Sequence, residues 1–134
     1  MTNKILPSAT LVEHAKKNIE VIYPFLAKKK HLDENTFFVD IRDIREIWKE
    51  GKLKDAFHAP RGMLEFWVDP QSPYFKQIFS SNRRFIFHCA SWWRSALSVA
   101  TLNDMGFEAT HISDGFSGWV EAGGPVEHLQ SKPS

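Results

Sequence analysis

The chain contains one cysteine, Cys89, and the residues that follow it could make this thiol reactive. Arg94 and Ser95 come shortly after it. Backbone N–H groups in a tight loop or at the start of a helix carry partial positive charge and attract an anion. A thiolate is such an anion, and so is the outer sulfur of a persulfide. The spacing therefore predicts an anion-binding loop around a nucleophilic sulfur, although an isolated cysteine is most often a small buried hydrophobe.

The segments on either side of Cys89 predict how this loop is positioned. Residues 85–87 form a short run of large apolar side chains, which is typical of a buried strand. After the loop, residues 96–105 carry apolar side chains at helical spacing, and Gly106 is a good helix stop. Cys89 is thus expected between a strand and a helix, where α/β proteins place their ligand sites.

A second strand is predicted at residues 36–41, because its apolar side chains do not alternate with polar ones. Asp40 interrupts the run, and a buried carboxylate needs a partner. Arg42 and Arg45 are close in sequence. We therefore interpret Asp40 and Arg42 as structural residues that fix the end of the strand.

Two helices are expected at the start of the chain. Thr10 and Glu13 have the spacing of a capping box, which predicts a helix from Thr10 to about Glu20. Pro24 suits the first turn of a second helix that reaches Lys30.

The remaining elements are short and alternate in type. They are a helix that begins with a capping box at 43–46 and ends at Gly51, a strand at 56–58, helical turns at 63–68, a helix at 74–79, a strand at 108–112 and a helix at 116–122. Such alternation indicates the α/β class with a mainly parallel sheet.

Composition limits the function classes. A chain of 134 residues fits one domain, and its single cysteine excludes an internal disulfide and suits a reducing cytosol. The chain has neither an apolar run of membrane length nor a signal-peptide pattern at its start, so we expect a cytoplasmic protein without a membrane partner. A net charge of +1 argues against nucleic acid. We find no phosphate-binding glycine motif and no metal-spaced His/Cys set, and we expect neither a cofactor nor a metal.

Four blocks of sequence resemble the single-domain rhodanese-like sulfurtransferase family. They are FFVDIRD at 37–43, GKLKDAFHAPRG at 51–62, CASWWRS at 89–95 and DGFSGWVEAGGPV at 114–126. The resemblance implies a rhodanese-like fold, with a mainly parallel five-stranded sheet flanked by helices. It also divides the chain into an N-terminal helical segment packed on the domain (1–35), the rhodanese-like domain (36–127) and a C-terminal tail (128–134), of which residues 131–134 are expected to be frayed.

The resemblance further implies a reaction. Cys89 would take a sulfane sulfur from a small donor such as thiosulfate and pass the resulting persulfide sulfur to cyanide or to a thiol, including a protein thiol. Arg94 would orient the anionic donor. The residues expected to line the loop and bind the substrate are Ala90, Ser91, Trp92, Trp93 and Ser95.

Trp92 departs from the family pattern, because related loops often carry glycine at this position. Glycine permits a positive φ or a close backbone approach, which tryptophan tolerates less easily. Two adjacent tryptophans in a tight loop leave little room inward, so we expect at least one of Trp92 and Trp93 to be largely exposed at the pocket mouth.

Two other functions compete with sulfur transfer. Phosphatases related to this fold carry a His-Cys-x5-Arg loop, and His88-Cys89 matches its start, but only four residues separate Cys89 from Arg94. The shorter loop favours a single sulfur atom over the bulkier phosphoryl group. A non-enzymatic binding module on the same scaffold is the other alternative, although this chain retains the cysteine, the arginine and Ser95.

Overall fold

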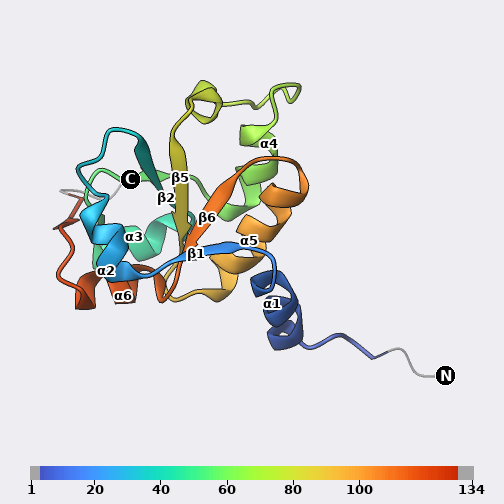
Figure 1. Ribbon diagram of the computed structural model, residues 1–134, viewed down its shortest axis with the longest axis horizontal. Helices are drawn as coiled ribbons and strands as arrows, with labels where there is room; N and C mark the ends of the chain where they lie inside the picture. The colour runs from blue at the N-terminus through green and yellow to red at the C-terminus, as the bar shows by residue number, and fades with distance from the viewer. Residues whose placement is uncertain (1–3, 130–134) are drawn as a thin grey trace.

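A parallel sheet of five strands forms the centre of the computed structural model, which describes residues 4–129 (Figure 1). Its order is β1-β6-β5-β2-β4, and every neighbouring pair is parallel. The strands are β1 (Glu20–Ile22), β2 (Thr36–Asp40), β4 (Phe57–His58), β5 (Arg84–His88) and β6 (Ala109–Ile112). A separate antiparallel pair joins β3 (Lys52–Leu53) to β7 (Val126–Glu127). The predicted fold class is confirmed.

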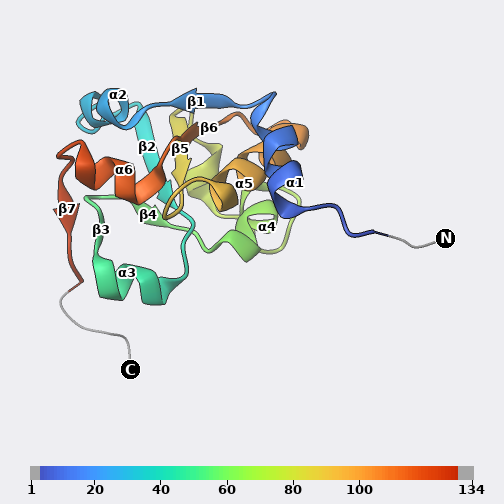
Figure 2. The same cartoon turned by 90° about the horizontal axis from the view of Figure 1, so that it is seen from below.

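Helices cover both faces of the sheet (Figure 2). On one side α5 (Trp93–Asp104) packs on β6 and is itself contacted by α1 (Ser8–Lys16) and α4 (Leu64–Val68). On the other side α2 (Pro24–Lys29) packs against α6 (Gly115–Glu121). The chain also forms α3 (Ile44–Glu50) and the 3₁₀ helices η1 (Arg61–Met63) and η2 (Gln77–Ser80).

Each face of the sheet buries its own hydrophobic cluster. On β5, Phe85 and Phe87 point to the cluster beneath α4 and α5, whereas Ile86 belongs to the cluster beneath α2 and α6. On β2, Val39 and Phe38 divide in the same way. Burial on both sides is the reason why these strands read as continuous apolar runs.

The N-terminal segment differs from its prediction. Helix α1 begins at Ser8, so Thr10 lies inside its first turn and caps nothing, and the helix ends at Lys16 rather than Glu20. Residues 20–22 form the edge strand β1, paired with β6. A three-residue edge strand has no local pattern of its own, because only the ladder with β6 defines it. The helix expected at 74–79 is reduced to η2.

The other predicted elements are found close to their expected positions. The capping box of Asp43 and Glu46 is present at the start of α3, and Gly51 ends that helix as predicted. The residues predicted as a frayed tail, 131–134, lie outside the described part of the chain. Among residues 4–129, no helix is long and apolar enough to span a membrane.

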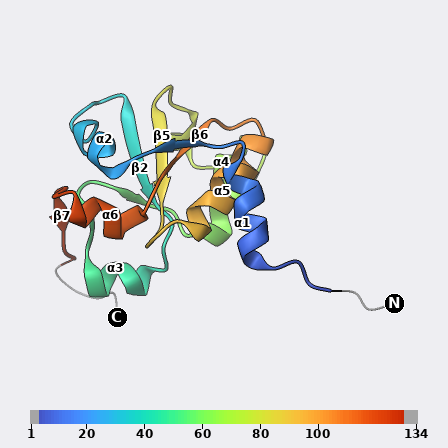
Figure 3. The ribbon, with the colours of Figure 1, turned by 60° about the horizontal axis from the view of Figure 1, so that its bottom comes forward.

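The ends of the elements converge on one edge of the sheet. Strand β5 runs directly into Cys89, and α5 begins at Trp93 after a short loop. Figure 3 shows the start of α6 beside this loop. The carboxyl end of β2 lies next to that of β5, because Asp40 and His88 are paired in the ladder.

Candidate active site

Cys89 lies at the base of the loop between β5 and α5, with only 1% of its surface exposed. Its Sγ accepts a hydrogen bond from the backbone N–H of Ser95 at 3.4 Å and lies 3.4 Å from the Ser95 hydroxyl oxygen. Ser95 belongs to the first turn of the twelve-residue helix α5. The positive end of the helix therefore faces the sulfur, which is the setting predicted from the sequence.

Helix α6 holds the loop from the opposite side. The N–H groups of Phe116 and Ser117 donate to the carbonyl oxygens of Cys89 (2.8 Å) and Ala90 (3.1 Å). Because N–H and C=O point in opposite directions across a planar trans peptide, the amides of Ala90 and Ser91 are turned away from α6. Gly115 precedes these donors with φ +51°, in the region that favours glycine. Gly115 belongs to the sequence block DGFSGW, for which no role in holding the loop was predicted.

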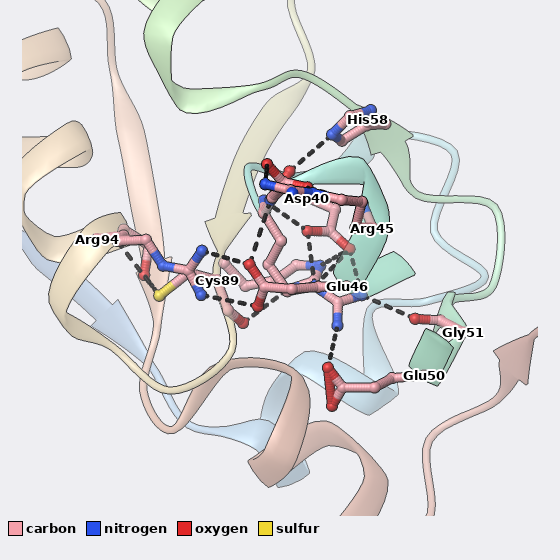
Figure 4. Close-up of polar contacts among 12 residues, drawn as sticks. Asp40, Arg45, Glu46, Glu50, Gly51, His58, Cys89 and Arg94 are labelled. Atoms are coloured by element: carbon pink, nitrogen blue, oxygen red, sulfur yellow. Dashed lines mark hydrogen bonds and ion pairs between the residues drawn. The ribbon is translucent and has the colours of Figure 1, made fainter. Parts of the chain in front are cut away.

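Arg94 makes a two-pronged ion pair with Glu46 (Figure 4). One terminal nitrogen lies 2.7 Å from Oε1 of Glu46 and the other 3.0 Å from Oε2. The hydrogen bonds that Arg94 donates to Glu46, and to a smaller extent the nearby Cys89 side chain, raise the pKa of Arg94. The same bonds lower the pKa of Glu46. Glu46 was predicted only as a capping residue, because its partner lies far along the chain.

The capping box of α3 fixes the Glu46 carboxylate in place. Asp43 accepts a hydrogen bond from the N–H of Arg45 at 2.9 Å, and its own N–H donates to Oε1 of Glu46 at 3.4 Å. The Arg45 side chain also pairs with Asp43, at 2.9 Å. The Glu46 carboxylate therefore accepts hydrogen bonds both from the capping box at the start of α3 and from Arg94.

A buried ion pair supports the loop from beneath. Asp40 and Arg42 are both fully buried and lie 2.7 Å apart, which agrees with their structural interpretation. Arg42 also donates to the carbonyl oxygen of Gly51 at 2.8 Å. Its guanidinium group lies 4.2 Å from the ring centre of Phe116, the residue whose N–H holds Cys89. The pair therefore links β2 to the helix that anchors the loop.

The two tryptophans of the loop have different surroundings. Trp92 has φ −160°, an extended value open to any residue, so this loop does not need the positive φ that glycine would permit. Lys16 from α1 lies 3.9 Å from the Trp92 ring centre, and Trp93 packs edge-on against that ring. Trp93 is 43% exposed and Trp92 is half-buried, so Trp93 is the more exposed of the two, and its position at the mouth of a pocket stays a prediction.

Two buried histidines flank the loop. Burial lowers the pKa of His88, whose Nδ1 lies 3.3 Å from the carbonyl oxygen of Cys89. Burial also lowers the pKa of His111 to about 4. Neither ring nitrogen of His111 has a hydrogen-bond partner among residues 4–129. Within the same range, no group of three or more His, Cys, Asp or Glu side chains could hold a metal ion.

A five-stranded parallel sheet with helices on both faces, whose central strand leads into a cysteine loop at a helix start, places the chain in the α/β class. The family model "Rhodanese-like domain" matches residues 26–122, and the chain belongs to this family. The match covers the loop, α3 with its capping box, and α6, but it begins after β1.

Individual relatives have mixed descriptions. "Putative sulfurtransferase YtwF" of Bacillus subtilis (strain 168) is 24% identical over 75% of this chain and 88% of its own length. A solved structure from Rhodopseudomonas palustris CGA009 is 43% identical with a TM-score of 0.89, over 95% of this chain and 99% of that one. It is described as a protein of unknown function and "Possible Tyrosine Phosphatase". A thiosulfate sulfurtransferase from Pseudomonas aeruginosa shares the fold at 19% identity and a TM-score of 0.68, over 85% of this chain but 20% of its own.

Proposed function

We propose that the protein is a sulfurtransferase that carries sulfane sulfur as a persulfide on Cys89. The observation that carries this proposal is the position of Sγ, which receives the Ser95 N–H at the start of α5 within a Cys-x4-Arg loop. The thiolate attacks the outer sulfur of a donor such as thiosulfate, an S–S bond forms on Cys89, and sulfite leaves with the electron pair of the broken bond. A thiol or cyanide then removes the outer sulfur and regenerates the thiolate.

The loop residues have separate roles in this proposal. The amides of Ala90 and Ser91, turned away from α6, are available to the outer sulfur, and Ser95 binds the inner one. Arg94 lies beside Cys89 and orients the donor in this proposal, with its charge shared by the Glu46 carboxylate. Trp92 and Trp93 form the outer wall of the loop, where the exposed Trp93 can meet a protein acceptor.

Phosphatase activity is the second candidate, because the 43% identical R. palustris protein is described as a possible tyrosine phosphatase. Only four residues separate Cys89 from Arg94, and both terminal nitrogens of Arg94 bind Glu46. A phosphoryl group needs a wider loop with free donors for three oxygens. These features favour sulfur over phosphate. The retained cysteine likewise favours an enzyme over a non-enzymatic binding module.

Intact-mass analysis after incubation with thiosulfate tests the proposal directly. Because Cys89 is the only thiol, one added sulfur atom that disappears with cyanide identifies the persulfide. The Cys89→Ser variant should fold, gain no sulfur and transfer none. Rapid hydrolysis of aryl phosphate by the wild type, with no added sulfur, would instead establish the phosphatase. A wild type that gains no sulfur from thiosulfate or from the monoanion benzenethiosulfonate, and that hydrolyses no aryl phosphate, would point to the binding module.

The Arg94→Lys variant tests how the donor is held. Lysine keeps the charge but loses the planar fork, so the KM for thiosulfate should rise more than the rate of alkylation by a neutral reagent changes. Equal effects on both measurements would mean that Arg94 acts on the thiolate or on the whole loop instead.

A further inference from the structure

The cation expected to attract a sulfur donor is already neutralised. Both terminal nitrogens of Arg94 bind the two oxygens of Glu46, at 2.7 and 3.0 Å. The pair is only partly exposed, with side-chain accessibilities of 34% and 29%. These two parallel hydrogen bonds occupy the end of the guanidinium group that would otherwise bind an oxyanion.

Glu46 cannot easily move aside. Its carboxylate also accepts the N–H of Asp43 in the capping box, so leaving Arg94 would not free it from α3. Moving the Glu46 carboxylate away would break its hydrogen bond with the Asp43 N–H and its charge-assisted hydrogen bonds with Arg94 together. The carboxylate is therefore a built part of the loop's surroundings rather than a mobile surface group.

The neighbouring arginines are paired in the same way. Arg42 is held by the buried Asp40, and Arg45 by Asp43 on the same helix. On this side of the loop, each of these cations is matched by a carboxylate. Lys16 contacts the loop from the other side, over the Trp92 ring. A dianion that approaches the α3 side thus meets paired charges instead of a positive field.

We infer that Glu46 is a specificity-determining residue that selects against dianionic sulfur donors, so that the natural donor carries its sulfane sulfur on a weakly charged group such as an organic persulfide. The inference rests on the proposed sulfur transfer. In this reaction the Cys89 thiolate attacks the outer sulfur of the donor RS–SH, the donor's S–S bond breaks, and RS⁻ leaves with that electron pair. The proton stays on the transferred sulfur, so no oxidant or reductant is required.

Two donors of different charge test the selection. Thiosulfate is a dianion and benzenethiosulfonate a monoanion, and both transfer one sulfane sulfur to a thiolate, leaving sulfite or benzenesulfinate. The Glu46→Gln variant keeps the side-chain shape and removes the negative charge. We expect it to raise the ratio of kcat/KM for thiosulfate to that for benzenethiosulfonate on the order of tenfold, because one unit charge is removed close to the donor.

Glu50→Gln is the matched control. Glu50 lies on the same helix and loses the same charge, but its carboxylate is 3.9 Å from Arg42 and makes no contact with Arg94. The donor ratio should stay near the wild-type value in this variant. An equal rise in both variants would assign the effect to net charge and overturn the role of Glu46.

Wild-type protein alone supplies a second measurement. If Glu46 neutralises Arg94, kcat/KM for thiosulfate should hardly change with ionic strength, whereas a free arginine would give a clear fall as salt screens it. A steep fall, or an unchanged donor ratio in Glu46→Gln, refutes the inference while sulfur transfer stands. Absence of any persulfide with either donor refutes the proposed function itself, and the inference with it.

Discussion

Gly115 lies against the backbone carbonyl oxygen of Cys89, so closely that a Cβ at residue 115 would overlap with that oxygen. The same Cβ would meet the carbonyl oxygen of Ser91 and the backbone of Ala90. Because these atoms belong to the backbone, they cannot rotate away as a side chain would. The shape of the cysteine loop therefore depends on a glycine in α6, well beyond it in sequence.

We predict that Gly115→Ala displaces the loop and lowers the free energy of unfolding by roughly 2–5 kcal/mol, from the positive φ and the overlap together. Persulfide formation on Cys89 should fall with it. Gly62→Ala is the control, since a Cβ there meets nothing within 4 Å. Urea unfolding and intact-mass analysis of both variants measure the effects. Similar behaviour of the two variants would contradict the prediction.

The alanine variants of the two loop tryptophans should behave differently. Trp93 is 43% exposed, so Trp93→Ala should change stability by less than about 1 kcal/mol. Trp92 is half-buried between Lys16 and Trp93, and Trp92→Ala should cost about 1–3 kcal/mol. Thermal unfolding separates these outcomes. If Trp93→Ala then slows transfer to a protein thiol but not to cyanide, Trp93 serves recognition; a large stability loss would place it in the core.

His111 should make the free energy of unfolding depend on pH below neutrality. Burial lowers its pKa from 6.5 to about 4, so below pH 6.5 the unfolded chain binds a proton that the folded chain does not. This residue's share of stability is therefore complete at neutral pH and is lost as the pH falls from 6.5 towards 4, by up to roughly 3 kcal/mol. Urea unfolding at pH 7 and pH 4.5 should show a smaller difference in His111→Leu than in the wild type. An equal difference in the two proteins would contradict the prediction.

The free energy of unfolding should fall more when one residue of the Asp40–Arg42 pair is replaced than when both are replaced. Asp40→Asn leaves a buried, uncompensated guanidinium group and should cost about 3–5 kcal/mol. Replacing both residues by apolar ones, in Asp40→Leu with Arg42→Met, should cost less than either single change. Denaturant titration of Asp40→Leu, Arg42→Met and the double variant measures the coupling. Additive losses would show that the two residues act separately.

The sequence predicted well those features that depend on residues close together along the chain. The continuous apolar runs of β2 and β5 were enough to indicate strands covered on both faces, and the spacing of Asp43 and Glu46 was enough to predict the start of α3. The need of Asp40 for a nearby cation followed from burial alone, and Arg42 supplies it. These inferences use only short-range spacing and the cost of burying charge.

What it missed depends on long-range contacts. The partner of Arg94 is Glu46, and residues this far apart meet only because β2 and β5 are adjacent in the sheet. The contact of Gly115 with the cysteine loop has the same origin. Strand β1 was missed because three residues carry too little pattern, and Thr10 looked like a cap although Pro7 precedes the helix. The structural roles of these residues exist only after the sheet has formed.

Strand β1 also determines where the chain can be truncated without exposing an edge of the sheet. The family match begins at residue 26, yet β6 pairs with β1 on one side and with β5 on the other. A fragment that starts at residue 26 would leave the β6 edge bare and uncover the surface of α5 on which α1 packs. Bare edges of this kind pair with other molecules, so such a fragment should self-associate. We therefore propose that the folding unit starts before α1 rather than at residue 36, and gel filtration of the fragment from residue 26 beside the full chain tests this boundary.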